Sequence, residues 1–298
     1  MDQQLRGKTG LSIELAKKIN GEIVSCDSMQ IYKEMNIGTA KVTNEEMQGI
    51  KHYMIDIAEP EERFSVSDYK LKAEDAIKEI INKGKVPIVV GGTGLYVNSL
   101  IYNIEYPEIT LDEKYRQELE EKAKRDGLET LYNEACKIDS KAMEKISPND
   151  KKRIIRVLEI YKETGKTKTE QEEFSKKIEP EFDYYIFGIN MDRQVLYERI
   201  NKRVDEMMDN GLVEEVEALI KKHPNMKTSL QSIGYKETIE FLNGSISKNE
   251  MVEKIKQETR RYAKRQLTWF RKIENIVWLN GEEKQDLNIQ TILKKTYT

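Results

Sequence analysis

The chain has 298 residues and a net charge of −3, with 35% charged and 38% hydrophobic residues. This length suits one large domain or a domain with an insertion, and the composition favours a soluble protein with long solvated helices. No apolar run approaches the roughly 18 residues of a membrane span and no leader pattern is present, so neither a membrane anchor nor an export signal is expected.

The two cysteines, Cys26 and Cys136, are neither in a C-x-x-C pair nor near a histidine at ligand spacing. We therefore expect no disulfide framework and no zinc site, and a reducing, cytoplasmic location. Because the net charge is small, any binding of nucleic acid must depend on local charge.

The first motif is Gly7-Lys8-Thr9, which matches the last three positions of a phosphate-binding loop and opens an amphipathic helix over about 11–19. In such a loop the Lys meets phosphate charge and the Thr hydroxyl binds Mg²⁺. A complete loop has glycine five positions before Gly7, where this chain has Asp2, and no apolar strand precedes it. We expect the diphosphate to bind poorly as a result.

A strand is predicted over 22–26, and Asp27 follows at its carboxyl end, where open α/β sheets bind ligands. An isolated Asp-Ser pair is, however, more often the N-cap of a following turn. A short strand over 52–57 and a helix that starts at a capping box from Ser65 to Asp68 and ends at Gly84 come next.

The β-branched run at 86–90 predicts a buried parallel strand that leads into Gly91-Gly92-Thr93-Gly94. The glycines allow a sharp turn that exposes N–H groups at a helix N-terminus, which is a phosphate-sized anion site. A strand-to-helix turn without a ligand fits the motif equally well. The predicted fold is α/β, with a P-loop-type parallel sheet flanked by helices.

Residues 111–180 lack strand signals and are predicted to form an inserted all-helical subdomain, with the sheet domain in 1–110 and 181–298. One of its helices is predicted to begin after the start signal at 147–150, which ends in Asp150, and to run to about Thr164, with Gly165 at its end. A strand over 184–189 and a helix over 193–208 follow. Arg203 falls beside the apolar stripe of that helix, so its side chain either extends to solvent or points at an anion.

The helix predicted over 250–272 has one apolar sector that packs, which includes Tyr262 and Trp269, and one cationic sector. No acidic residue lies between Arg260 and Lys272. Solvated faces usually mix charges of both signs, so we favour an RNA-binding face. A last strand over 276–279 and a helix from 286 complete the prediction.

Six motifs resemble those of the bacterial tRNA dimethylallyltransferases, which prenylate the adenosine 3′ of the anticodon: GKTGLSIELA at 7–16, DSMQIY at 27–32, IGTAK at 37–41, VGGTGLY at 90–96, QSIGYKE at 231–237 and RRYAKRQLTWFRK at 260–272. Their order and spacing cover nearly the whole chain.

The resemblance implies that Asp27 is the general base, that Thr93 contacts the substrate near the reacting base and that Arg203 meets the pyrophosphate. It implies dimethylallyl diphosphate and the tRNA anticodon arm as substrates, Mg²⁺ bound through Thr9, and no obligate protein partner. The diphosphate site would include Gly7, Lys8 and Thr9. The tRNA-binding residues would be Asp27, Ser28, Met29, Gln30, Thr93, Lys152, Arg153, Ile154, Ile155, Arg156, Gln231, Gly234, Arg260, Lys264 and Arg265.

Three alternatives stay open. A P-loop small-molecule kinase would explain Gly7-Lys8-Thr9 and the sheet but not the cationic helix. A free-nucleotide isopentenyltransferase would act on AMP without tRNA. A catalytically impaired RNA-binding relative would explain the altered phosphate loop.

Overall fold

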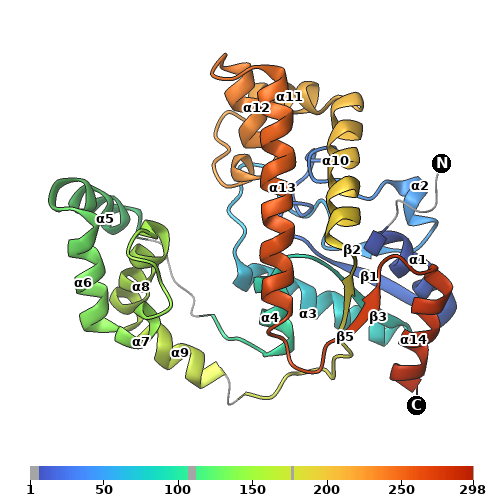
Figure 1. Ribbon diagram of the computed structural model, residues 1–298. Coiled ribbons are helices and arrows are strands. Elements are labelled where there is room, and N and C mark those ends of the chain that lie inside the picture. The colour runs from blue at the N-terminus through green and yellow to red at the C-terminus, as the bar shows by residue number, and fades with distance from the viewer. Residues whose placement is uncertain (1–6, 107–111, 176–177, 298) are drawn as a thin grey trace. The chain divides into compact units, whose positions relative to one another are not determined.

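The structure, a computed structural model, describes residues 7–106, 112–175 and 178–297 (Figure 1). The chain divides into two compact units. Unit 1 comprises Met1–Val97 and Asp183–Thr298, and unit 2 comprises Asn98–Phe182. In the described residues, no helix is long and apolar enough to cross a membrane.

Unit 1 is built on parallel strands, as predicted for the α/β class. The strands β1 (Gly21–Cys26), β2 (His52–Tyr53) and β3 (Val86–Gly91) form a sheet in the order β2-β1-β3. The pairing of β1 with β3 ends at Cys26 and Gly91, so the two strands finish level with each other. A separate parallel pair is formed by β4 (Phe187–Asn190) and β5 (Val277–Asn280).

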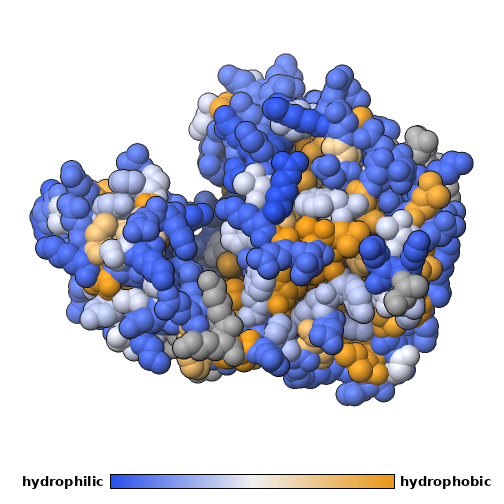
Figure 2. Space-filling model, turned by 60° about the horizontal axis from the view of Figure 1, so that its bottom comes forward, coloured by the Kyte–Doolittle hydropathy of each residue, from blue (hydrophilic) through white to orange (hydrophobic). Residues whose placement is uncertain are grey.

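The strand β3 differs from its prediction, because it is only partly buried whereas β1 is buried throughout. Within the described residues β3 pairs with β1 alone, and Val86 is 37% exposed. Ile88 of β3 and Ile189 of β4 nevertheless pack in one cluster beneath α1 (Gly7–Ile19) and α14 (Gln285–Tyr297). Apolar side chains gather in a hollow on one face of this unit (Figure 2).

The helices beside the sheet begin where their caps place them. Helix α3 (Val66–Asn82) begins after a capping box formed by Ser65 and Asp68, as predicted, and buries Tyr69 and Ile80. Helix α1 packs on β1 and β3, and α4 (Gly94–Ile101) starts directly after the Gly-rich turn. A short helix, α2 (Asn44–Met47), precedes β2.

A helical layer in unit 1 shares a core with the segment that follows Asp27. It consists of α10 (Arg193–Asp209), α11 (Leu212–Lys222), the 3₁₀ turn Ser229–Gln231, α12 (Tyr235–Leu242) and α13 (Lys248–Phe270). The buried members of this core include Ile31, Tyr32, Met35, Leu212, Val216, Tyr235 and Met251.

The carboxylate of Glu215 in α11 holds the start of the IGTAK segment. Its oxygens accept hydrogen bonds from the backbone N–H groups of Asn36, Ile37 and Gly38 over 2.9, 2.8 and 3.1 Å. The Tyr235 hydroxyl donates to the same carboxylate over 2.6 Å. One carboxylate therefore accepts hydrogen bonds from three consecutive backbone N–H groups.

Unit 2 is all-helical. Its helices are α5 (Glu113–Asp126), α6 (Leu128–Ile138), α7 (Ser140–Met143), α8 (Lys151–Thr164) and α9 (Lys168–Ser175). Helix α8 starts after Asp150 and ends at Gly165, as predicted. Ile154 and Ile155 are 0% and 1% exposed in the core of this unit. Their side chains pack against other helices of the unit, and whether this segment contacts tRNA stays a prediction.

Candidate active site

The ends of β1 and β3 are tied together by hydrogen bonds. The N–H groups of Gly92 and Thr93 both donate to the carbonyl oxygen of Cys26 over 3.1 Å. The N–H of Ser28 donates to Oγ1 of Thr93 over 3.0 Å, and the Thr93 hydroxyl donates to Oγ of Ser28 over 3.3 Å. Asp27, between Cys26 and Ser28, is thereby held beside Thr93.

Asp27 acts as a cap through one of its two oxygens. Its Oδ1 atom accepts hydrogen bonds from the N–H groups of Met29 and Gln30 over 2.9 and 3.3 Å. Within the described residues no hydrogen bond is made to its other oxygen, Oδ2. The capping role and a role as proton acceptor are thus compatible, because they use different oxygens.

The Gln30 side chain is occupied by contacts within the protein. Its amide oxygen accepts from the Ser25 hydroxyl over 3.3 Å, and its Nε2 lies 3.2 and 3.3 Å from the carbonyl oxygens of Thr39 and Ala40. Met29 packs against the helical core of unit 1. Both side chains shape the segment after Asp27, and whether either contacts tRNA stays a prediction.

Lys8 lies within electrostatic range of both Asp27 and a second cation, Arg203. The Lys8 ammonium donates to the carbonyl oxygen of Gly91 over 3.3 Å. The pKa of Lys8 is lowered, chiefly because the surrounding protein desolvates its ammonium. The positive charge of Arg203 lowers this pKa further, and the Asp27 carboxylate raises it. Lys8 keeps solvent-exposed surface, as does Arg203 on α10. Two like charges placed this way are suited to an anion that can approach both.

Cys26 is not a candidate nucleophile. Its thiol is fully buried, and burial raises its pKa to about 12. A neutral thiol is a poor nucleophile, because the thiolate is the reactive form.

Thr9 is exposed in the first turn of α1, next to Lys8, and Gly7 has a φ of 37°. The rest of the predicted phosphate loop, including the departure at Asp2, lies outside the described residues. In the described part of the chain, no group of three or more His, Cys, Asp or Glu side chains could hold a metal ion.

Helix α13 contributes side chains that were not predicted as site residues. The Nε2 of Gln266 donates to the carbonyl oxygen of Gly92 over 2.7 Å. The Tyr262 side chain lies near Gln266 and Thr93, and the Trp269 ring packs against Gly94. Tyr262 and Trp269 were assigned to the packing sector of the helix. Gln266 lies four residues after Tyr262 and three before Trp269, so all three side chains share one face of the helix. A polar amide on an otherwise apolar face is the sequence signal that could have identified Gln266.

The predicted RNA-binding residues of unit 1 have different surroundings. Lys264 and Arg265 are exposed on α13, whereas Arg260 donates to Oδ1 of Asn201 on α10 over 2.6 Å. Gln231 is exposed, and Gly234 is buried with a φ of 95°.

The predicted RNA-binding cations of unit 2 lie on α8. Lys152 and Arg153 are exposed there, and Arg153 forms an ion pair of 3.2 Å with Asp150. Arg156 is half-buried and lies 3.4 Å from Glu159.

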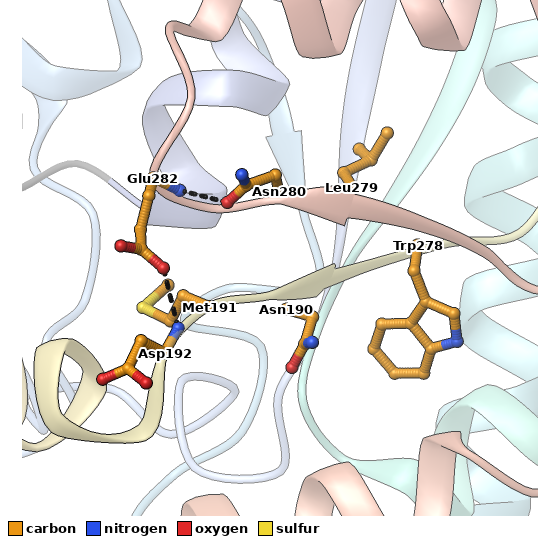
Figure 3. A pocket seen from close by; sticks show the side chains of 7 residues that line it. All are labelled: Asn190, Met191, Asp192, Trp278, Leu279, Asn280 and Glu282. Atoms are coloured by element: carbon orange, nitrogen blue, oxygen red, sulfur yellow. Dashed lines mark hydrogen bonds between the residues drawn. The ribbon is translucent and has the colours of Figure 1, made fainter.

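A shallow pocket of about 320 Å³ lies at the carboxyl ends of β4 and β5 (Figure 3). Trp278 and Asn190 point to one side of the strands, and Glu282 accepts a hydrogen bond of 2.8 Å from the N–H of Asp192. None of the seven residues that line it is basic. It is therefore less suited to a diphosphate than the site at Lys8 and Arg203.

The sequence was compared with models of known protein families and with known proteins. Residues 30–273 match the family model described as IPP transferase. The chain is 53% identical over 278 residues to the tRNA dimethylallyltransferase of Acetivibrio thermocellus, covering 93% of this chain and 89% of that protein. It is 50% identical over 275 residues to that of Thermoanaerobacter sp., covering 91% and 87%.

Solved structures of tRNA isopentenyl- and dimethylallyltransferases are also similar to this chain. The tRNA delta(2)-isopentenylpyrophosphate transferase of Staphylococcus epidermidis has a TM-score of 0.70 and 44% identity, covering 97% of this chain and 94% of that one. A eukaryotic dimethylallyltransferase acting on tRNA has a TM-score of 0.79 and 31% identity, covering 96% and 74%. The chain therefore belongs to the IPP transferase family.

Proposed function

We propose that this protein transfers a dimethylallyl group from dimethylallyl diphosphate to the exocyclic amine of the adenosine 3′ of the anticodon in tRNA, releasing diphosphate. The observation that carries the proposal is the placement of Asp27 beside Thr93, with Lys8 within electrostatic range of both Asp27 and Arg203. The relatives named tRNA dimethylallyltransferase support the choice of substrates.

In this reaction the allylic C–O bond breaks, a C–N bond to the amine forms, and the amine loses a proton. Lys8 and Arg203 stabilise the negative charge that develops on the leaving diphosphate. Oδ2 of Asp27 accepts the proton while Oδ1 continues to hold the Met29 and Gln30 N–H groups. The Thr93 hydroxyl contacts the base next to that carboxylate.

Thr9 fits a role in binding Mg²⁺. Mg²⁺ sites usually combine one or two protein oxygens with substrate phosphates and water, so one exposed hydroxyl beside Lys8 at the start of α1 is a sufficient contribution. When bound, the ion would neutralise charge on the diphosphate. Among the described residues, no atom lies within 4 Å of where a Cβ on residue 7 would stand.

Recognition of tRNA falls to exposed cations and to the segment after Asp27. A base in a folded anticodon arm must leave the stack before its amine can react, at a cost of a few kcal/mol. We assign phosphate contacts to Lys264 and Arg265 on α13 and to Lys152 and Arg153 on α8. We further propose that the protein acts as a monomer in the cytoplasm.

The test is transfer of labelled dimethylallyl from its diphosphate, with Mg²⁺, to an anticodon stem-loop that has adenosine 3′ of the anticodon. A matched stem-loop with guanosine at that position serves as the control. Label on the adenosine RNA alone supports the proposal, whereas label on neither RNA contradicts it.

Two added reactions separate the alternatives. Transfer to AMP without RNA would favour a free-nucleotide isopentenyltransferase, and phosphate transfer from ATP to a small molecule would favour a kinase. An RNA that binds tightly but receives no prenyl group would favour a non-catalytic RNA-binding relative.

A further inference from the structure

The side-chain amide of Gln266 on helix α13 makes a hydrogen bond to the Gly-rich turn. The Nε2 of Gln266 lies 2.7 Å from the Gly92 carbonyl oxygen, and the two residues are 174 positions apart in the chain. A Cβ on residue 92 would lie 2.1 Å from the same nitrogen and 3.2 Å from the Lys8 ammonium. Only glycine at this position lets the Gln266 amide and Lys8 approach together.

The bond from Gln266 completes a two-sided restraint on one peptide unit. The carbonyl of Gly92 and the N–H of Thr93 belong to the same planar group. The N–H donates to the Cys26 carbonyl oxygen over 3.1 Å, and the carbonyl accepts from Gln266 over 2.7 Å. The orientation of this peptide plane sets the direction of the Thr93 Cα–Cβ bond. Hydrogen bonds to both the Gly92 carbonyl and the Thr93 N–H therefore hold the Thr93 hydroxyl in place.

Neighbouring side chains on the same face of α13 extend the contact. Tyr262, one turn before Gln266, lies near both Gln266 and Thr93. One turn after it, the Trp269 ring is so close to Gly94 that a Cβ there would lie 2.5 Å from Cδ1. Lys264 and Arg265 on the same turns are exposed. One side of this helix thus faces Thr93 and the Gly-rich turn, and its other side presents the cationic side chains of Lys264 and Arg265 to solvent.

We propose that Gln266 is a positioning residue for prenyl transfer, which holds the Gly92–Thr93 peptide so that the Thr93 hydroxyl stays beside Asp27. The inference rests on the proposed function. Its role is assigned to the turn and not to the substrate amine, because its amide nitrogen is directed at the Gly92 carbonyl. It joins the helix that carries the RNA-facing cations to the turn that carries Thr93.

The first test compares Gln266→Met with Gln257→Met. Methionine has nearly the length of glutamine but cannot donate, and Gln257 is exposed on the same helix. For Gln266→Met we expect the single-turnover transfer rate to fall by roughly 10- to 100-fold, since a small misplacement of a reacting group has a large effect on rate. The Kd for the stem-loop should stay within about threefold. For Gln257→Met neither quantity should change.

The second test is a double-mutant cycle between Gln266→Ala and Gly92→Ala. A methyl group at residue 92 displaces the Gln266 amide, so each change breaks the same hydrogen bond. Because that methyl group also lies 3.2 Å from the Lys8 ammonium, Gly92→Ala can cost more than Gln266→Ala, and we expect the double variant to be no slower than Gly92→Ala alone. Losses that multiply would show that Gln266 does not act through Gly92, and would overturn the proposal.

Two readouts keep the result independent of turnover. Amide hydrogen exchange at Thr93 should be faster in Gln266→Met than in the wild type and unchanged in Gln257→Met. Fluorescence of a stem-loop with 2-aminopurine at the target position should rise on binding equally in all three proteins. A loss of that rise in Gln266→Met would assign Gln266 to RNA binding instead.

Failure of the wild type to transfer a prenyl group would contradict the proposed function. An unchanged rate or unchanged Thr93 exchange in Gln266→Met would contradict only the role of Gln266.

Discussion

The N–H of Ser28 donates a hydrogen bond of 3.0 Å to Oγ1 of Thr93, a residue 65 positions later in the chain. This bond joins the carboxyl ends of two adjacent parallel strands, which is where ligands bind in open α/β sheets. It also places the Asp27 carboxylate within a short, rigid turn. The predictions that follow depend on that placement.

Replacing Asp27 by Asn should lower the transfer rate by about 10²–10⁴-fold, because the variant loses the general base. Asn can keep the cap, since its Oδ1 also accepts from backbone N–H groups. The stem-loop Kd should therefore change by no more than a few-fold. The matched control is Asp192→Asn, which caps α10 with bonds of 2.7 and 3.3 Å from Gln194 and Val195. Near-normal turnover of the Asp27 variant would remove Asp27 from the mechanism.

Arg203→Ala should raise the Kd for dimethylallyl diphosphate and slow the reaction, because the leaving charge loses one of two cations. Lys202→Ala, on the same exposed helix surface, should change neither. Diphosphate binding can be measured by calorimetry with Mg²⁺. If Arg203→Ala lowers only the Tm, then Arg203 serves to cover apolar surface rather than to bind an anion.

Changing Lys264 and Arg265 to Gln should weaken tRNA binding and reduce the magnitude of the log Kd against log salt slope by about one to two, because fewer counterions are released. The same charge is removed in Lys221→Gln with Lys222→Gln on α11, where both lysines already pair with acids. A slope that changes equally in the two double variants would mean that total charge, not the α13 face, governs binding.

Glu22 makes acid stability a further test. It is 5% exposed, and although burial alone would raise its pKa, hydrogen bonds from Lys85 and Tyr53 and the charge of Lys83 lower the pKa below its usual 4.5. A lowered pKa in the folded state contributes stability above about pH 4.5, which is lost as the pH falls through the folded-state value.

Glu22→Gln should thus have a lower Tm than the wild type at pH 7, with the difference shrinking below pH ~4.5. Thermal unfolding across this range measures it. Glu217→Gln removes an exposed pair with Lys221 and should shift the Tm little at any pH. If the Tm difference between Glu22→Gln and the wild type is the same at every pH, then Glu22 stabilises the protein through packing and not through its charge.

Local signals predicted the helices well. The capping box at Ser65 gives the first residue of α3, and Asp150 with Gly165 gives both ends of α8. The strands were less exact. A strand was expected over 52–57 and formed only at His52–Tyr53, and β4 begins at Phe187 instead of residue 184. Strand length depends on the partner strand, which a local pattern does not contain.

The contacts that hold the candidate site were predicted least. Asp27 and Thr93 follow strands that end level, so their proximity can be inferred from sequence. Gln266 and Glu215 bond to backbone atoms of segments more than 170 residues away, and such a target leaves no pattern in side chains. The sequence analysis also did not anticipate that Ile154 and Ile155, which stand beside basic residues, are buried in the core of unit 2.

The bonds from Glu215 to the N–H groups of residues 36–38 have a consequence for synthesis. These donors leave the ribosome 177 to 179 residues before their acceptor does. At roughly 5–20 residues per second, the segment after Asp27 waits about 10–35 s for the carboxylate that orders it. A nascent chain that ends before α11 therefore exposes this loop without its partner, and a chaperone or protease acting during translation meets it first.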